Sequence, residues 1–210
     1  MIALFFDTET TGLKSKSNPS FKPALVQLGA ILQDTESGTV LAEVNLIVQQ
    51  VDKKPIPIEA SNIHGITDEM AEKYGAPLKL VDMVFANLLL KADVVVAHNI
   101  DYDLDVVEDN MPYSQDRIKD KKHFCTMDKN VYKVKAPLTM KQRAYYSSKG
   151  EKPDKPYKSP SLVETYKYYF HTTFDGAHDA MNDIRACRDV YFEMHKPDDA
   201  KKEPKQAALV

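Results

Sequence analysis

Apolar and polar positions along the first 50 residues follow the pattern of three β-strands. Residues Ile2–Phe6 form a short apolar run, which is typical of a buried strand. Two longer apolar segments follow, Ala24–Asp34 and Gly38–Gln50, and the turn between them contains Gly38, as hairpin loops often do. We therefore predict a three-stranded antiparallel meander.

The rest of the chain alternates helical and extended patterns. Apolar residues recur at helical spacing in Pro77–Ala92, whereas Asp93–Asn99 is a short β-branched run that suits a central strand. Asp101–Asp109 and Gly176–Met194 are predicted to form helices. Strands first, followed by helices that alternate with a later strand, predict an α/β fold with a mixed sheet.

Two segments break this pattern. Residues Ser147–Ser161 are rich in Pro, Ser and Lys and predict a long loop. The polar residues 196–210 predict a disordered tail. We therefore expect one domain over residues 1–195, followed by this tail.

Composition indicates the size of the core and the cellular compartment in which we expect the protein. The 210 residues are 43% hydrophobic, which is enough to form one sizeable core. No apolar run is long enough to span a bilayer and no signal peptide is visible, so we expect no membrane contact. Cys125 and Cys187 suggest neither a disulfide framework nor a zinc site, which fits a reducing, cytoplasmic location.

The net charge of −3 is unevenly distributed along the chain. Residues 111–170 hold 14 Lys and Arg against 6 Asp and Glu, a balance of +8, while the remainder carries 14 against 25, a balance of −11. The same segment contains 8 of the 11 tyrosines. Basic residues interleaved with aromatic ones suit a nucleic-acid backbone and its exposed bases. A solvated basic face is the alternative that this feature leaves open.

Two carboxylates follow the first predicted strand. Asp7 and Glu9 are two residues apart, so in an extended chain they project from the same face. Magnesium requires hard oxygen ligands of this kind. The pair therefore predicts a site for a divalent cation, with exposed acids at a strand end as the alternative.

A second polar cluster follows the later strand. His98 and Asn99 lead into a helix with aspartates at 101, 103 and 105, and open sheets form their sites at such strand ends. Acids in a first helical turn are also favoured by the helix dipole alone. The helical period places Asp103 on the face opposite Asp101 and Asp105.

The third cluster lies at the start of the last predicted helix. His178 and Asp183 are five residues apart, which corresponds to roughly 140° around an ideal helix. The two side chains can share one site only if His178 lies before the helix, or in its first turn, and turns back.

Together the stretches "FDTETTGL", "AHNIDYD" and "HDAMND" resemble the three motifs of the DnaQ-like, or DEDDh, 3′→5′ exonucleases. That family includes the proofreading exonuclease subunit of bacterial DNA polymerase III. Asn62–Thr67 and Cys125–Met127 match further landmarks, and the resemblance runs from Met1 to about Met194. It implies a ribonuclease H-like fold, which is a five-stranded mixed sheet flanked by helices.

The resemblance also implies roles for individual residues. Two divalent ions, Mg²⁺ or Mn²⁺, would be held by Asp7, Glu9, Asp103 and Asp183. His178 would be the general base. Glu9 would be a catalytic residue as well as a metal ligand. The substrate would be bound by Thr10, Gly12, Leu13, His64, Ile66 and Asn99. One departure from the family pattern is Tyr102, which stands where Phe is more usual.

The implied activity is hydrolysis of phosphodiester bonds from the 3′ end of mainly single-stranded DNA, with release of nucleoside 5′-monophosphates. Single-stranded nucleic acid is then the expected partner, with DNA favoured over RNA, and a polymerase is a further expected partner for DNA proofreading. No residue reports on a 2′-hydroxyl, so a 3′→5′ exoribonuclease remains an alternative. A catalytically inactive nucleic-acid-binding module and another ribonuclease H-like enzyme, such as an endonuclease or strand-transferase, are the others.

Overall fold

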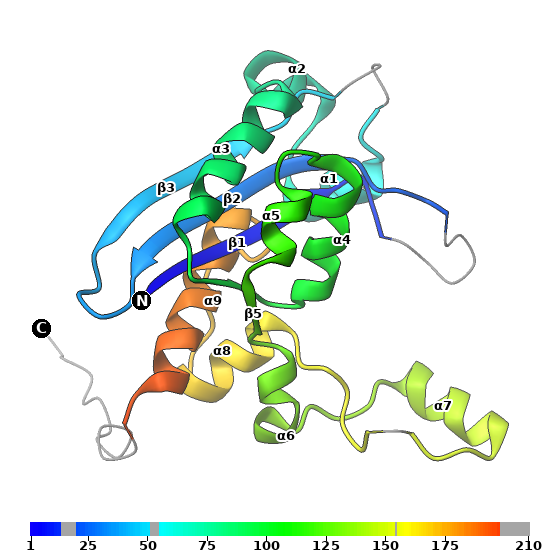
Figure 1. The fold of residues 1–210 in the computed structure, drawn as a ribbon. Coiled ribbons are helices and arrows are strands. Elements are labelled where there is room, and N and C mark those ends of the chain that lie inside the picture. Colours follow the sequence, from blue (N-terminus) through cyan, green and yellow to red (C-terminus); the bar gives the residue numbers. More distant parts are fainter. Residues whose placement is uncertain (14–19, 51–54, 154, 198–210) are drawn as a thin grey trace, which may run out of the picture.

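The structure is a computed structural model that describes residues 1–13, 20–50, 55–153 and 155–197. One mixed sheet with the strand order β3-β2-β1-β4-β5 forms its centre (Figure 1). Its strands are β1 Ile2–Thr10, β2 Leu25–Asp34, β3 Val40–Ile47, β4 Val94–Ala97 and β5 Lys122–Cys125. The first three strands pair antiparallel, whereas β4 lies parallel to β1 and to β5. This confirms the predicted meander and the five-stranded mixed sheet.

Helices cover both faces of the sheet (Figure 1). The α-helices of the described residues are α1 Ile58–His64, α2 Asp68–Tyr74, α3 Leu78–Lys91, α4 Ile100–Asn110, α5 Gln115–Lys119, α6 Val131–Val134, α7 Met140–Lys149, α8 Leu162–Phe170 and α9 Ala180–His195, of which α7 does not pack on the sheet. The larger apolar core joins the sheet to α3, α4 and α5, and a second core joins its other face to α9. The result is the three-layer arrangement that the resemblance implies.

The central strand β1 is buried on both faces, which explains its unbroken apolar run. Phe5 packs edge-to-face on Tyr191 of α9, with ring centroids 5.3 Å apart. On the opposite face Phe6 packs against Phe85 of α3, at 5.2 Å. Each side chain of β1 therefore faces either the α9 layer or the α3 layer.

Strand β1 is four residues longer than the apolar run indicates. It continues to Thr10, so Asp7 and Glu9 lie within the strand rather than after it. The cause is pairing with β2, which extends past Glu9 to a register shift at Thr10. The backbone at both carboxylates is thus held by pairing with β2 on one side, beyond the point where the pairing of β1 with β4 ends.

The last helix begins four residues later than predicted. The Asp179 carboxylate caps α9 by accepting the backbone N–H groups of Met181 and Asn182, each at 3.1 Å. His178 has a φ of 73°, a left-handed conformation that keeps it out of the helix. The condition for His178 to turn back toward Asp183 is therefore met.

The basic segment 111–170 has more regular structure than its sequence pattern indicates. Strand β5 and helices α5, α6 and α8 lie against the body, whereas α7 extends away from it (Figure 1). The loop predicted at Ser147–Ser161 is helical up to Lys149, where α7 ends. The loop begins only after the C-terminal cap at Gly150.

Two further expectations concern the ends and the surroundings of the chain. No helix in the part that the structure describes has both the length and the apolar character needed to cross a membrane. The predicted tail, 196–210, lies outside the described residues from 198 onward, so the domain boundary at 195 stays a prediction.

Candidate metal and substrate site

Three carboxylates meet beside the middle of the sheet. Asp7 and Glu9 project from one face of β1, and Asp183 reaches them from the first turn of α9. One carboxylate oxygen from each residue lies within 4.8 Å of the others. This separation is short enough for the three oxygens to share a single cation.

A glycine allows α9 to approach the sheet at this point. Gly29 of β2 pairs with Asp7, and a Cβ atom at Gly29 would lie 2.4 Å from Cδ1 of Ile184 and 3.2 Å from Cβ of Ala180. A larger residue would require the end of the Ile184 side chain to move and would press on Ala180 and Met181 in the first turn of α9, the turn that carries Asp183. The sequence pattern did not indicate this role for Gly29.

The fourth acid comes from α4. Asp103 is 2% exposed, and its Oδ1 accepts hydrogen bonds from the Thr8 backbone N–H at 3.1 Å and from Thr8 Oγ1 at 2.7 Å. Asp101 and Asp105 are exposed, as the helical period predicts. Asp103 is therefore held against β1 while its two neighbours face solvent.

These carboxyl groups are hard to ionise together without a counter-charge. Burial, reinforced by the neighbouring carboxylates, raises the pKa of Asp7 to about 8 and the pKa of Glu9 to about 9. Burial is also the main reason why the pKa of Asp183 rises to about 6 and that of Asp103 rises well above its usual value. A divalent cation would supply the missing positive charge.

A buried oxygen atom without a hydrogen-bond partner also indicates a cation site. Oδ1 of Asp183 is buried and has no hydrogen-bond partner among the described residues. A buried acceptor left unpaired is costly unless an ion or water satisfies it. With its carboxylate donors and this free oxygen, the site fits the hard divalent cations Mg²⁺ and Mn²⁺.

His178 stands at the edge of the acid cluster. Its backbone N–H donates to Oδ2 of Asp183 at 3.2 Å, which ties the loop before α9 to a carboxylate of the acid cluster. Its side chain is exposed and lines both cavities that open beside the acids. The imidazole can therefore reach a water molecule or a substrate placed at the carboxylates.

The two cavities meet at the acid cluster. The acid cavity, about 430 Å³, contains all four acids and Asn99 and is closed on one side by Lys158–Leu162. The second cavity, about 620 Å³ and mainly apolar, lies between the end of β1 and α1 and is called the terminal cavity because it adjoins the end of that strand. Both are lined by Thr8, Glu9, Leu13, Tyr102 and His178.

Most of the predicted substrate-binding residues line these cavities. Thr10, Gly12, Leu13 and His64 line the terminal cavity, where the Leu13 residue is 71% exposed. Asn99 lines the acid cavity. These placements agree with the predicted roles, which nevertheless remain predictions.

Ile66 is not brought to either cavity. It is 3% exposed and packs in a small core with Val26 and Ala60, because the chain turns inward after α1. Its backbone N–H donates to Nδ1 of His64 at 3.1 Å, so the backbone of Ile66 helps to orient that imidazole. Ile63, which is 58% exposed, lines the terminal cavity in its place.

Tyr102, the residue of the second motif that departs from the family pattern, forms two hydrogen bonds through its hydroxyl group. Oη of Tyr102 donates to the Gly12 carbonyl oxygen at 2.9 Å and is also hydrogen-bonded to Oγ1 of Thr10. A phenylalanine could make neither bond. Tyr102 therefore holds the backbone that follows β1 at the boundary between the two cavities.

His98 links three segments beside the acid cavity. Its Nδ1 lies 2.9 Å from Oγ1 of Thr126 and its Nε2 lies 3.0 Å from the carbonyl oxygen of Pro160. Burial lowers the pKa of His98 to about 4, so the ring is neutral near neutral pH. The sequence singled out His98 as polar but did not indicate this bridge.

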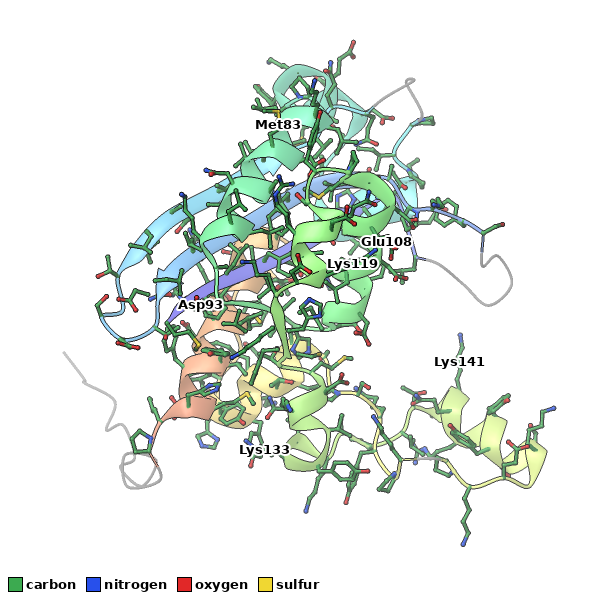
Figure 2. All side chains as sticks on the ribbon, in the orientation of Figure 1. Met83, Asp93, Glu108, Lys119, Lys133 and Lys141 are labelled. Carbon is green, nitrogen blue, oxygen red and sulfur yellow. The ribbon has the colours of Figure 1, made fainter. Side chains whose placement is uncertain are left out.

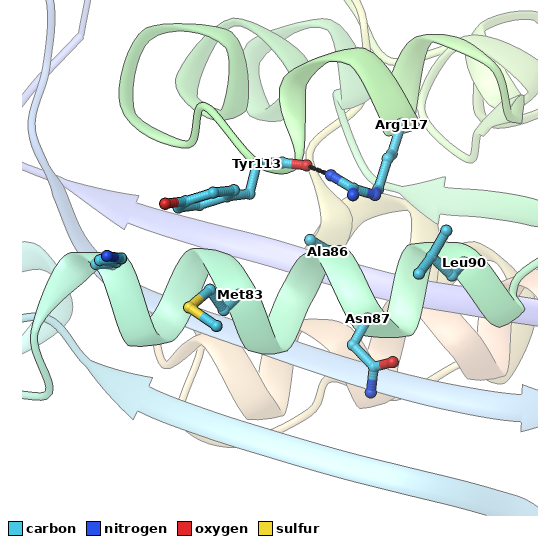
Figure 3. A pocket seen from close by; sticks show the side chains of 7 residues that line it. Met83, Ala86, Asn87, Leu90, Tyr113 and Arg117 are labelled. Atoms are coloured by element: carbon cyan, nitrogen blue, oxygen red, sulfur yellow. Dashed lines mark hydrogen bonds between the residues drawn. The ribbon is translucent and has the colours of Figure 1, made fainter.

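A third hollow, about 350 Å³, lies between α3 and the segment that carries α5 (Figure 3). Met83 and Leu90 form its apolar floor, and Arg117 donates to the Tyr113 carbonyl oxygen above them. None of the predicted site residues lines this hollow. It is therefore separate from the acid cluster.

A five-stranded mixed sheet, with four acids from its central strand and two flanking helices around one cavity, is the arrangement of a DnaQ-like exonuclease. The sequence matches the model of the Exonuclease family over residues 4–191, and the chain belongs to this family. It is 25% identical over 189 residues to "DNA polymerase III subunit epsilon" of Treponema pallidum (strain Nichols), a match that covers 90% of this chain and 74% of the relative. It is also 36% identical over 100 residues to "Uncharacterized exonuclease CP81" of Escherichia phage 186, covering 48% of this chain and 44% of that protein.

Solved structures show the same fold. Exonuclease I of E. coli in complex with a dA16 oligonucleotide superposes with a TM-score of 0.64 at 18% identity, over 95% of this chain and 42% of that one. Cell-death related nuclease 4 gives a TM-score of 0.59 at 15% identity, over 92% of this chain and 63% of that one. The chain thus spans about two fifths of exonuclease I, and at these identities the likeness shows the fold alone.

Proposed function

We propose that residues 1–195 form a metal-dependent 3′→5′ exonuclease domain that releases nucleoside 5′-monophosphates from single-stranded DNA. The observation that carries this proposal is the acid cluster. Asp7, Glu9 and Asp183 place carboxylate oxygens within 4.8 Å of one another, in a chain that belongs to the Exonuclease family. Carboxylates alone repel a negatively charged phosphodiester. A cluster of them therefore serves hydrolysis only when it binds cations that supply positive charge.

Two divalent ions, Mg²⁺ or Mn²⁺, would be held by Asp7, Glu9, Asp103 and Asp183. When bound, they supply positive charge that stabilises charge developing at phosphorus and on the leaving oxygen, and that acidifies the attacking water. The two hydrogen bonds from Thr8 to Oδ1 of Asp103 fix the direction of that carboxylate before any ion arrives. The bond from the His178 backbone does the same for Asp183.

His178 is the proposed general base. Its exposed side chain lies at the junction of the two cavities, where it can take a proton from water that attacks the terminal phosphodiester. Its left-handed backbone and the bond from its N–H to Asp183 hold the residue before the helix. The backbone of His178 and the Asp183 carboxylate are consequently held together.

The terminal cavity suits the last nucleotide of a strand. Leu13 and Ile63 give it apolar walls against which a base can lie, and the backbone at Thr10–Gly12 is fixed by Tyr102. The cavity joins the acid cavity at Glu9 and His178. A 3′-terminal nucleotide bound here would present its 5′ phosphate to the acids, which yields a nucleoside 5′-monophosphate on hydrolysis.

Two comparisons support single-stranded DNA as the substrate and a polymerase as a partner. Exonuclease I structures with a similar fold contain dA16 and dT13 oligonucleotides. The relative from Treponema pallidum bears the name of a DNA polymerase III subunit. We extend the proposal to DNA proofreading beside a polymerase, which would be supported if a purified replicative polymerase and this chain co-elute in gel filtration.

The test of the proposed function uses strands of one sequence, labelled at the 5′ end, as single-stranded DNA, duplex DNA and RNA. With Mg²⁺ or Mn²⁺, we expect a ladder that shortens one nucleotide at a time, fastest for single-stranded DNA, and no products in EDTA. A faster ladder on RNA would favour the exoribonuclease. Binding without hydrolysis would favour the inactive module, and internal cuts an endonuclease.

A further inference from the structure

One part of the basic segment is built unlike the rest of the protein. Residues 136–160, called the arm below, leave the body after α6 and return before α8, and Figure 1 shows the arm standing out from the sheet layers. Helix α7 at its centre has no buried residue, and Met140 is 82% exposed. In its described residues, 136–153 and 155–160, the arm is thus an extension without an apolar core of its own.

Helix α7 is stabilised by local hydrogen bonds at its two ends and not by packing against the body. Thr139 and Gln142 form a capping box at its start, and Gly150 closes its end in a left-handed conformation. Helices of about ten residues are marginal in water without tertiary packing, so these caps matter. A surface maintained in this way suits contact with something outside the chain.

The chemistry of the arm points to the kind of ligand. The arm has six basic residues, Lys141, Arg143, Lys149, Lys152, Lys155 and Lys158. Its acidic residues number only two, Glu151 and Asp154, so its net charge is +4.

Tyrosines lie among these charges. Tyr145 is 55% exposed, and its ring lies edge-to-face with that of Tyr146, with centroids 5.4 Å apart. Figure 2 shows Lys141 projecting from α7 into solvent, whereas Lys133 lies on α6 and approaches the Tyr169 hydroxyl at 3.4 Å. Exposed cations with interleaved aromatic rings are the surface that single-stranded nucleic acid recognises.

The base of the arm is part of the acid cavity. The Lys158 backbone N–H donates to the Ala136 carbonyl oxygen at 3.0 Å, which joins the two ends of the arm. The Pro160 carbonyl oxygen lies 3.0 Å from Nε2 of His98, and Lys158–Leu162 line the acid cavity. A strand that enters the acid cavity therefore meets the arm without leaving the protein surface.

We propose that the arm binds the single strand upstream of the scissile phosphodiester, an inference that rests on the proposed function of the acid cluster. The terminal nucleotide occupies the terminal cavity, and the preceding nucleotides pass Lys158–Leu162 and continue along the arm. Lys141, Arg143 and Lys149 contact the phosphates, and Tyr145 and Tyr146 stack on bases. Sequence-independent contacts of this kind let one site act on successive nucleotides.

The experiment measures binding in EDTA, where no hydrolysis occurs, by the fluorescence anisotropy of labelled oligothymidylate of about 12 nucleotides. The arm variant carries Lys141→Gln, Arg143→Gln and Lys149→Gln. The control carries Lys73→Gln, Lys79→Gln and Lys91→Gln, which removes the same charge from exposed positions on α2 and α3. Because every substituted residue of the arm is unburied, both variants should fold.

We expect the arm variant to lose about tenfold or more in affinity at low salt, and the control less than about twofold. The log–log dependence of affinity on salt should flatten by about 2 in the arm variant, at roughly 0.7 per lost phosphate contact. Tyr145→Ala with Tyr146→Ala should weaken binding with the salt slope unchanged. Equal affinities and slopes for the arm variant and the control would overturn the proposal, as would a retained slope in the arm variant.

The binding experiment tests the arm proposal independently of catalysis. If the wild-type protein binds the strand through the arm but shows no hydrolysis with Mg²⁺ or Mn²⁺, the proposed function fails while the arm proposal stands. If the wild-type ladder forms and the arm variant binds normally, the arm proposal alone fails. An arm that instead contacts a second copy of the chain would show a shift in sedimentation that the arm variant abolishes, with strand affinity unaltered.

Discussion

Asp103 has neighbours of the same residue type that provide matched controls. It is buried against Thr8, whereas Asp101, one half-turn away, is exposed. Asp103→Asn keeps the shape of the side chain but removes a charge facing the acid cavity. We expect it to lower kcat by about 100-fold or more, the scale of losing one preorganised electrostatic group.

Asp101→Asn makes the same chemical change on the solvent face of α4. We expect its kcat to stay within about twofold of wild type, because exposed charges contribute little. Both variants should be compared in single-turnover hydrolysis of a 5′-labelled strand. Equal losses in the two variants would mean that Asp103 has no special place in the reaction.

His178 can be tested without disturbing its backbone. Asn tolerates a left-handed conformation, so His178→Asn removes the imidazole while keeping the φ of 73° accessible. We expect kcat to fall by about 10²–10⁴-fold with little change in strand binding. His171, exposed and with a φ of 58°, supplies the matched control His171→Asn, which should keep wild-type kcat. A wild-type rate in His178→Asn would remove this residue from the mechanism.

The raised pKa values of the acids predict how metal-free stability depends on pH. An unfolded carboxyl group titrates near pH 4, whereas Asp7 and Glu9 hold their protons to about pH 8 and 9 in the folded chain. Between these values the folded state binds more protons than the unfolded state, so the free energy of unfolding falls as the pH rises. In EDTA we therefore expect Tm to decrease from about pH 5 to about pH 9.

Asp7→Asn should flatten this decrease, because the substitution removes one charge from the cluster. At about pH 9 its Tm in EDTA should exceed that of wild type by about 3 °C or more, the shift that roughly 1 kcal/mol produces in a domain of this size. Mn²⁺ should raise the Tm of wild type more than that of Asp7→Asn. A wild-type Tm that climbs between pH 5 and pH 9 in EDTA would contradict the electrostatic description of the site.

At the scale of elements, the contact between α9 and β2 positions Asp183 beside Asp7 and Glu9. Gly29→Ala adds a Cβ that would lie 2.4 Å from Cδ1 of Ile184. We expect the variant to lose about 1–3 kcal/mol of stability through overpacking, and to lose activity because Asp183 moves with α9. Chemical denaturation and single-turnover assays measure the two effects.

Ile184→Val removes the Cδ1 atom that the new methyl group meets. Alone, it should cost about 0.5–1.5 kcal/mol. Combined with Gly29→Ala, it should restore part of the lost activity, and the double variant should be more stable than the sum of the single effects predicts. Strict additivity in the double-mutant cycle would show that Gly29 and Ile184 are not in contact.

Elements with strong periodicity could be predicted from the sequence, and weakly patterned ones could not. Strands β1 to β4 and helices α3, α4 and α9 carry long apolar runs or stripes, because they face the core. Strand β5 has four half-exposed or exposed residues, and α7 has no buried residue, so neither leaves an apolar pattern. Their places depend on pairing with β4 and on local caps.

At the scale of the whole molecule, the site joins residues that are far apart in the sequence. The acids and His178 can be identified from three short motifs that match a family pattern, and the fold places all of them around the acid cavity. Contacts such as those of Gly29 and Tyr102 could not be predicted, because they depend on tertiary neighbours. The burial of Ile66 could not be predicted for the same reason, since it depends on packing against Val26 and Ala60.

The distribution of charge also has meaning only in the folded molecule. The sequence indicates that residues 111–170 are basic, but not that the exposed arm stands beside an acid cavity. Under the proposed function, cations would neutralise the acid cavity, and the arm would attract the strand that is hydrolysed there. The overall charge of −3 conceals this division between the two surfaces.

The central claim is that the acid cluster removes nucleotides one at a time from a 3′ end. The most direct measurement uses one single-stranded DNA in two forms, labelled either at the 5′ end or in the last internucleotide phosphate, with Mn²⁺ and either wild type or Asp7→Asn. Wild type should release the 3′ label first, as a nucleoside 5′-monophosphate, while the 5′-labelled strand shortens stepwise, and Asp7→Asn should do neither at a comparable rate. Initial release of the 5′ terminus, or an unaltered rate in Asp7→Asn, would contradict the account.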